Sequence, residues 1–202
     1  MLGATSQLQD FIVTKDDVFS SKICDELINE YENEIWENSI TIGDRTTDYR
    51  VCKQITISSR QIIKDSEHRK QLDQTVFETI TPLLKEYAEK FDGFFNYESD
   101  TGYNILKYEP GDFYKEHTDQ IEKNWFNEQG QISKDCLVKR KVTLIVQLNE
   151  EFEGGGLSFF GNTFKTKIKK GSVILFPANL LFPHQALPVT KGTRYSLITW
   201  IH

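Results

Sequence analysis

The sequence predicts a mainly β domain in which an antiparallel core is preceded by a layer of helices. Two amphipathic helical patterns occupy the first half of the chain. Short β-rich runs separated by Gly, Pro, Asn and Asp follow from about residue 102. No further helical pattern lies between these runs after residue 140, which favours a sandwich, barrel or jelly roll over a parallel βαβ sheet.

Length and composition indicate a single domain over residues 1–202, with helical support mainly over 15–95 and the β-core over about 100–202. The formal charge of −6 disfavours a nucleic-acid partner. No apolar run approaches the ~20 residues that span a bilayer, and the opening residues lack a signal-peptide pattern. We therefore expect a cytoplasmic protein that does not enter a membrane. The cysteines, Cys24, Cys52 and Cys136, are expected to be free thiols.

The helical layer is predicted from two apolar stripes. After a short strand at 11–13, Ser20 or Ser21 can cap a helix. Its stripe is formed by Ile23, Leu27, Ile28, Tyr31 and Ile35. A second helical region covers about 66–91, and Pro82 is expected to break or kink it. The apolar stripe of this second region consists of Leu72, Val76, Ile80, Leu83, Leu84, Tyr87 and Phe91.

Loops and strands are predicted for the remainder of the chain. Residues 39–50 are polar and indicate a loop before a strand at 51–58. Residues 120–139 form a long polar segment that contains Trp125, and a lid and a surface loop fit it equally well. Strands are predicted over residues 103–108, 142–148, 157–160, 164–168, 172–176 and 195–201.

Three residues of the β-rich half are candidate metal ligands. His117 and Asp119 follow a turn, and residues two apart on a strand point to the same side. His184 follows 65 residues after Asp119 and supplies a second imidazole. Two imidazoles and one carboxylate are the ligand set of non-haem Fe(II) oxygenases. Zinc can use the same three ligands with a water molecule.

A candidate anion-binding pair lies close behind the third ligand. Arg194 and Ser196 share one face of a predicted strand, ten residues after His184. A guanidinium group binds a carboxylate with two parallel hydrogen bonds, and a hydroxyl adds another donor. An arginine that snorkels to solvent is the alternative. The short interval to His184 favours an inward-facing arginine that binds an anion.

Several motifs appear in a fixed order. They are Tyr108-x-x-Gly111-x-x-Tyr114-x-x-His117-x-Asp119, then Arg140-x-x-Thr143 before Leu148-Asn149, then Gly154-Gly155 before Phe159, Lys170-Gly171 before Leu175-Phe176, and His184, Pro188-Val189, Gly192, Arg194 and Trp200-Ile201-His202. This set resembles the Fe(II)/2-oxoglutarate-dependent dioxygenases, specifically the prolyl 4-hydroxylase-like branch. The resemblance covers about residues 100–202, with a looser match over 17–50. Gly156 departs from it, since relatives commonly have glutamate there.

The resemblance implies a double-stranded β-helix, or jelly roll, with helices packed on its major sheet. It implies that His117, Asp119 and His184 hold Fe(II), and that 2-oxoglutarate and O₂ are cosubstrates with ascorbate as reductant. Arg194 would bind the distal carboxylate of 2-oxoglutarate. The other cosubstrate-binding positions implied are Tyr108, Thr143 and Ser196.

The resemblance also implies a peptidyl proline as substrate, hydroxylated as 2-oxoglutarate is decarboxylated to succinate and CO₂. Residues 41–53 match a loop that covers peptide in related hydroxylases, and we expect this loop and 120–139 to clamp an extended chain. Retention of Asp119 favours a hydroxylase over a halogenase. Candidate substrate-facing residues are Arg50, Tyr114, Trp125, Gln147, Trp200 and His202.

Other functions remain open from the sequence. The same iron centre could hydroxylate a free amino acid or another small molecule. Demethylation of nucleic-acid bases is less well supported, because the chain shows no basic stripe. A cupin-like metal-binding module without turnover would keep the jelly roll and the three ligands. It would not need Arg194 and Ser196.

Overall fold

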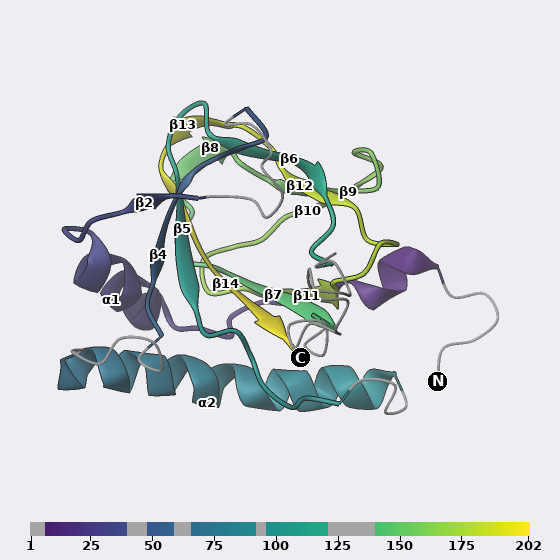
Figure 1. Cartoon of the computed structure of the whole chain (residues 1–202), viewed down its shortest axis with the longest axis horizontal. Helices are drawn as coiled ribbons and strands as arrows, with labels where there is room; N and C mark the ends of the chain where they lie inside the picture. Colours follow the sequence, from purple (N-terminus) through teal and green to yellow (C-terminus); the bar gives the residue numbers. More distant parts are fainter. Residues whose placement is uncertain (1–6, 40–47, 59–65, 92–95, 121–139) are drawn as a thin grey trace, which may run out of the picture.

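The computed structural model describes residues 7–39, 48–58, 66–91, 96–120 and 140–202. These ranges are mainly β and contain two α-helices and one short 3-10 helix (Figure 1). The helices are η1 (Leu8–Phe11), α1 (Ser21–Tyr31) and α2 (Glu67–Lys90). In the described part of the chain, no helix is long and apolar enough to cross a membrane.

The strands form two main sheets and a small ribbon, and every recorded pairing between strands is antiparallel. The seven-stranded sheet contains, in spatial order, β1 (Val13–Lys15), β11 (Val173–Pro177), β7 (Val142–Gln147), β14 (Arg194–Ile201), β5 (Asn104–Tyr108), β4 (Lys53–Thr56) and β2 (Glu37–Asn38). The five-stranded sheet contains β10 (Phe164–Thr166), β9 (Leu157–Phe159), β12 (His184–Ala186), β6 (Phe113–His117) and β3 (Arg50–Val51). The ribbon pairs β13 (Val189–Gly192) with β8 (Phe152–Gly154).

The period-two pattern of the central strands divides the core into two layers. On β7, Leu144 and Val146 join the buried residues of α1 and α2 in one cluster. Ile145, between them, joins residues of the five-stranded sheet in a second cluster. Figure 1 accordingly shows α2 along one side of the seven-stranded sheet and β6, β12 and β9 on its other side. Polar residues that alternate with the helix-facing ones therefore point between the two sheets.

Helix α1 begins as predicted and ends earlier than predicted. The Ser20 hydroxyl accepts a hydrogen bond from the Ile23 backbone N–H at 3.3 Å, which caps the first turn. The helix stops at Tyr31, and Ile35 is 89% exposed. The prediction that Ile35 extends the buried stripe is wrong. The chain turns away after Tyr31 toward β2, so the helical period no longer decides which side chains are buried.

Helix α2 is a continuous helix that contains Pro82. The expected break at this residue is wrong. Buried side chains on both sides of the proline, among them Val76, Ile80 and Leu84, pack in the same cluster against the sheet. This packing holds the helix together across the missing backbone hydrogen bond.

Several strands lie where the sequence suggested none. The ribbon strands β8 and β13, the short β12 at His184, and β2 were not predicted. Each has two to four residues, which is too short to produce a clear alternating pattern. The expected strand at 11–13 is displaced, because residues Leu8–Phe11 form η1 and the strand begins at Val13.

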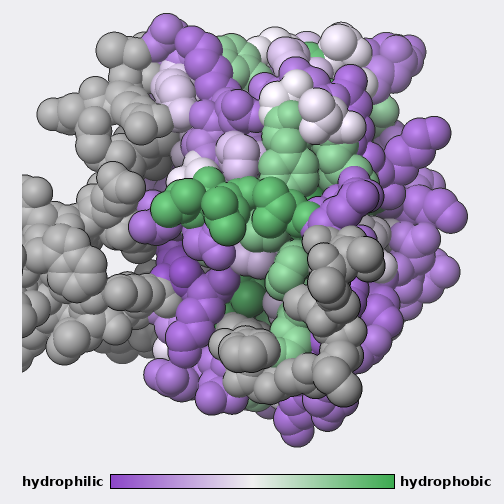
Figure 2. Space-filling view, turned by 90° about the vertical axis from the view of Figure 1, so that its right-hand side faces the viewer, coloured by the Kyte–Doolittle hydropathy of each residue, from purple (hydrophilic) through white to green (hydrophobic). Residues whose placement is uncertain are grey.

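One face of the molecule carries a band of hydrophobic side chains among hydrophilic ones (Figure 2). It lies on the side where η1 is seen in Figure 1. The large exposed hydrophobic residues of the described chain include Leu8 in η1, Leu180 and Leu181. The ring of Phe182 lies 6.1 Å from that of Phe11, so the loop before β12 packs beside η1.

Candidate metal centre and active site

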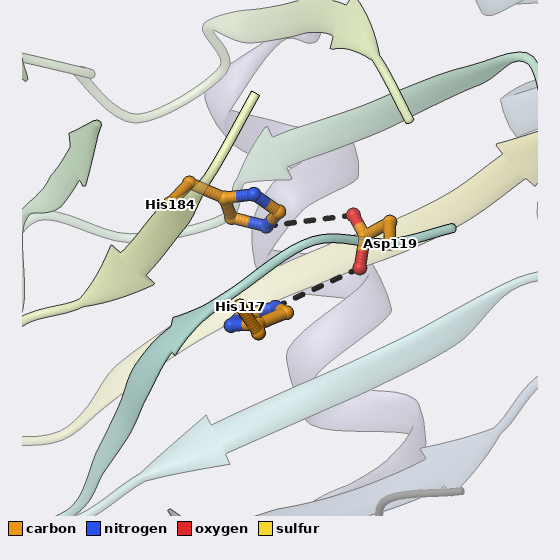
Figure 3. A group of neighbouring side chains, drawn as sticks. All are labelled: His117, Asp119 and His184. Carbon is orange, nitrogen blue, oxygen red and sulfur yellow. Dashed lines mark ion pairs between the residues drawn. The ribbon is translucent and has the colours of Figure 1, made fainter. Parts of the chain in front are cut away.

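His117, Asp119 and His184 come together between the two sheets (Figure 3). β6 ends at His117, Asp119 follows two residues later, and β12 begins at His184, which is paired in register with His117. Asp119 Oδ1 lies 3.6 Å from His117 Nε2, and Asp119 Oδ2 lies 3.4 Å from His184 Nε2. One ligand atom from each residue falls within 4.8 Å of the others. The three predicted ligands thus form one cluster.

Backbone carbonyl groups fix the orientation of both imidazoles. His117 Nδ1 lies 2.8 Å from the carbonyl oxygen of Lys115, and His184 Nδ1 lies 3.1 Å from that of Phe182. A carbonyl can only accept, so each Nδ1 carries the proton. Each Nε2 therefore presents its lone pair toward Asp119. This is the arrangement in which histidines bind metals.

Electrostatics keep the ligand atoms in their metal-binding forms. Burial lowers the pKa of His184 to about 4, so its imidazole is neutral at pH 7. Burial alone would raise the pKa of Asp119. The neighbouring imidazoles of His184 and His117 and the hydrogen bond from the Thr143 hydroxyl outweigh burial and hold this pKa below its ordinary value. Two imidazoles and one carboxylate fit a divalent iron or zinc ion.

Thr143 contacts a metal ligand. Its hydroxyl donates a hydrogen bond to Asp119 Oδ2 at 2.7 Å, and it is fully buried on β7. The family resemblance predicts that the Thr143 hydroxyl binds 2-oxoglutarate. In the structure this hydroxyl is used by the carboxylate ligand, whose orientation it fixes. The family resemblance predicts that Thr143 belongs to the site, but the partner of its hydroxyl depends on how β6 and β7 face each other.

Arg194 is 3% exposed and lies at the start of β14, opposite Tyr108 of β5. Its guanidinium carbon is 5.3 Å from the centroid of the Tyr108 ring. Burial lowers the pKa of Arg194, and none of the described residues forms an ion pair with it. A buried guanidinium without a counterion is costly. Arg194 therefore has the properties of a binding group for an anionic ligand.

The Gly154-Gly155 turn lies directly on this arginine. A Cβ atom at Gly155 would lie 3.2 Å from Arg194 Cδ and 2.9 Å from a methyl group of Val189. Gly155 also has a positive φ of 63°. The glycine pair of the family motif thus allows the backbone to cover the arginine closely.

Gln147 is buried on β7 and its side chain contacts Arg194. It is 2% exposed, and its side-chain NH₂ donates to the carbonyl oxygens of Asn149 at 2.9 Å and Tyr195 at 3.0 Å. These bonds turn its Oε1 toward Arg194, whose Nε donates to it at 3.0 Å. Gln147 therefore orients Arg194, and its contact with substrate stays a prediction. Ser196 is buried opposite Gln147 in the strand register.

Two other substrate-facing candidates lie next to the cluster. Tyr114 stacks on His117 with 3.4 Å between ring centroids. The Arg50 guanidinium lies 4.7 Å from the Tyr114 centroid. Burial raises the pKa of Tyr114 to about 12, so this phenol is neutral. Trp125 and most of the two predicted clamp segments lie outside the described residues.

The C-terminal candidates surround a residue that had been assigned no role. The Arg140 guanidinium lies 3.6 Å from the centroid of the Trp200 ring, and its Nη1 donates to the backbone oxygen of Asp119 at 3.3 Å. Burial and the charge of Arg140 lower the pKa of His202. Arg140 lies three residues before Thr143 in the Arg-x-x-Thr motif, and this spacing is the sequence feature that could have identified Arg140 as a site residue. Cys52 was also missed, and it is buried in the same cluster as Tyr108.

Comparison with known proteins shows which family model the chain matches. The model of the 2OG-Fe(II) oxygenase superfamily matches residues 103–202. Procollagen-lysine,2-oxoglutarate 5-dioxygenase 1 of Mus musculus is 24% identical over 192 residues, which cover 91% of this chain and 23% of the mouse protein. The chain thus spans about a quarter of that curated relative.

Solved structures of prolyl hydroxylases share the fold. The viral collagen prolyl hydroxylase of Paramecium bursaria Chlorella virus-1, solved with 2OG, has a TM-score of 0.66 at 21% identity, covering 95% of each chain. A prolyl hydroxylase from Trichoplax adhaerens, in complex with a hypoxia inducible factor peptide fragment, has a TM-score of 0.71 at 18% identity. That match covers 95% of this chain and 83% of the other. At these identities the likeness concerns the fold alone.

Proposed function

Because the chain belongs to the 2OG-Fe(II) oxygenase superfamily, we propose that it is an Fe(II)- and 2-oxoglutarate-dependent dioxygenase that hydroxylates a peptidyl proline. One observation carries the proposal. Besides the cluster of His117, Asp119 and His184, the chain has Arg194, a buried guanidinium that has no counterion among the described residues. A metal-binding module alone would not need that arginine.

The iron would be held by His117 Nε2, His184 Nε2 and one oxygen of Asp119. The carbonyl groups behind both histidines keep these nitrogens unprotonated. Thr143 would keep the carboxylate of Asp119 turned toward the metal. These contacts prepare the ligand atoms before the ion arrives, which lowers the cost of binding it.

The cosubstrate would be held at its far carboxylate by Arg194. Gln147 accepts from Nε of Arg194, so the two terminal nitrogens are left to form the paired hydrogen bonds that suit a carboxylate. Tyr108, beside the guanidinium, and Ser196, on the same face of β14, would line the same pocket. Iron and 2-oxoglutarate together supply the oxidation, in which one oxygen atom of O₂ enters succinate as CO₂ leaves and the other enters the substrate C–H bond.

We further assign residues 1–202 to one catalytic domain and its two facing sheets to a double-stranded β-helix supported by α1 and α2. The shared core clusters support this assignment. The chain folds like a viral collagen prolyl hydroxylase and a prolyl hydroxylase solved with a peptide. These likenesses support a peptide substrate.

Hydroxylation of a peptidyl lysine is the second candidate. It is favoured by the mouse procollagen-lysine relative, which aligns with 91% of this chain. The charges beside the cluster oppose it, because Arg50 and Arg140 would repel a lysine ammonium group. A neutral proline ring meets no such repulsion, and Tyr114 offers it an aromatic surface.

Turnover of 2-oxoglutarate tests the proposed function. The purified protein, supplied with Fe(II), ascorbate and 2-oxoglutarate, should form succinate, and proline peptides should increase the rate. Product peptides should gain one oxygen atom by mass spectrometry. His117→Ala and Asp119→Ala should abolish succinate formation, because each removes one of three metal ligands.

His68→Ala is the matched control for these variants. His68 lies on the surface helix α2 and its Nε2 is 3.6 Å from Glu30. This variant should keep the activity of the unmodified protein. Full activity in His117→Ala or Asp119→Ala with iron present would refute the metal assignment. Tight metal binding without succinate formation would favour a binding module.

A further inference from the structure

Arg50 is a positively charged residue beside the metal cluster whose charge is not balanced within the described chain. It lies on β3, opposite Tyr114 in the register, and its guanidinium stands over the Tyr114 ring. Among the described residues, its Nε atom is buried without a hydrogen-bond partner. The charged or polar groups that act on it are the side chains of Tyr108, Cys52 and Tyr114, and none of these is a carboxylate.

Arg140 is a second positively charged residue beside the same metal cluster. Its guanidinium carbon lies 3.6 Å from the centroid of the Trp200 ring, and its Nη1 donates to the backbone oxygen of Asp119. Arg140 therefore lies beside the proposed iron. Its Nε atom also has no partner within the described part of the chain. The charge of Arg50 is close enough to act on Arg140. The two guanidinium groups therefore lie near each other, and each is beside the metal cluster, Arg50 over Tyr114 and Arg140 at the Asp119 backbone.

The proposed iron and cosubstrate do not supply the missing negative charge. The two positive charges of Fe(II) and the one of Arg194 equal the combined negative charge of Asp119 and the 2-oxoglutarate dianion. Asp119 is also the one carboxylate of the described residues that acts on Arg140. With the cofactors bound, no carboxylate among the described residues would be left to balance the charges of Arg50 and Arg140 next to the substrate. Such charges are unfavourable away from bulk water unless an anion pairs with them.

We propose that the substrate presents a carboxylate to Arg50 and Arg140 while its target C–H bond faces the iron. This inference rests on the proposed function. The carboxylate can be an acidic side chain next to the hydroxylated proline in a peptide, or the α-carboxylate of a free amino acid. Both sources use the same paired hydrogen bonds from a guanidinium group. Further polar atoms lie near Arg140, since Trp200 Nε1 and both nitrogens of His202 are buried without partners within the described chain.

Paired probes test this inference. Binding would be measured by calorimetry, without turnover, to the full protein carrying Mn(II) and 2-oxoglutarate. The peptide probes are acetyl-Ala-Pro-Gly-amide, acetyl-Glu-Pro-Gly-amide and acetyl-Ala-Pro-Glu-amide. The small probes are free L-proline and L-prolinamide, which lacks the carboxylate. A probe that carries a carboxylate should bind about 10- to 100-fold more tightly than its neutral counterpart, as expected for a charge-assisted pair. A preference for the acidic peptides identifies a side-chain carboxylate as the group bound, and a preference for L-proline over L-prolinamide identifies the α-carboxylate of a free amino acid.

Charge variants assign the preference to the two arginines. Arg50→Gln and Arg140→Gln should each reduce the affinity for the preferred carboxylate probe about tenfold and leave the neutral probe unchanged. Arg50→Lys keeps the charge but cannot form the paired hydrogen bonds, so its affinity for the carboxylate probe should lie between those of the unmodified protein and Arg50→Gln. Lys115→Gln removes a charge from β6 at an exposed residue paired with Asp48, and it should change nothing. Circular dichroism and a thermal melt confirm that each variant is folded.

Equal affinity for charged and neutral probes, failure of every probe to bind, or a preference that survives both glutamine variants would overturn the inference. Iron-dependent succinate formation is measured in parallel without any probe. If succinate forms but no carboxylate preference is found, the inference fails and the proposed function stands. If no succinate forms, the proposed function fails.

Discussion

Replacing Gln147 by methionine tests whether a buried side chain that is hydrogen bonded to Arg194 controls cosubstrate binding. The Gln147 side chain makes three hydrogen bonds, two to backbone carbonyls and one from Arg194 Nε. Methionine has a similar length and shape but neither donates strongly nor accepts strongly. The change therefore removes the acceptor that aims Arg194 without creating a large cavity.

The expected magnitudes follow from these bonds. Two neutral hydrogen bonds contribute about 1 kcal/mol each, and the bond from the charged guanidinium about 1.5–3 kcal/mol. The free energy of unfolding should therefore fall by roughly 3–5 kcal/mol. The Tyr195 carbonyl keeps a second partner, the Leu148 N–H, so the loss should lie toward the lower value. If Arg194 loses its orientation, the affinity for 2-oxoglutarate should fall about tenfold, which corresponds to about 1.4 kcal/mol.

Calorimetric titration of 2-oxoglutarate into the Mn(II) form and urea denaturation measure the two effects separately. Ile145→Val is the matched control, because Ile145 lies between Thr143 and Gln147 on the same face of β7. It should cost about 0.5–1.5 kcal/mol of stability and leave 2-oxoglutarate binding unchanged. Metal affinity should be unchanged in both variants. A Gln147→Met protein that loses stability but binds 2-oxoglutarate normally would refute the positioning role.

Three further predictions concern other parts of the molecule. Thr143→Val should weaken metal binding about tenfold, because Asp119 loses the 2.7 Å bond that orients it, and Thr143→Ser should restore it; an unchanged metal titration would contradict this role. Gly171→Ala should lower the melting temperature strongly. The φ angle of Gly171 is +81°, a left-handed conformation that destabilises a non-glycine residue by about 1–2 kcal/mol, and the new Cβ would also clash with the Phe19 carbonyl oxygen at 2.1 Å. Burial raises the pKa of the Cys24 thiol to about 11, so alkylation at pH 8 should be slow in the native protein and fast in urea when followed by mass spectrometry. Rapid native labelling of Cys24 would show that this core region opens easily.

The sequence determined the layered architecture because side-chain periodicity reports which face of an element is buried. The alternation along residues 142–147 separates helix-facing Leu144 and Val146 from inward-facing Thr143 and Gln147. The same signal failed where local pattern and long-range packing disagreed. Pro82 remains inside α2, and Ile35 lies on the surface. Both outcomes depend on contacts with residues far away in the chain.

The sequence by itself also identified the chemical groups of the site. Histidine, aspartate and arginine side chains at fixed intervals identified the candidate metal ligands and Arg194. The structure brings the three ligands into one cluster and buries Arg194. Only the tertiary structure decided which neighbour each polar group contacts. Thr143 bonds Asp119, Gln147 bonds Arg194, and Arg50 approaches Arg140 from residues 90 positions away. The physical reason is that a hydrogen bond depends on distances of a few tenths of an ångström, which the pairing of strands between two sheets sets and a one-dimensional pattern does not contain.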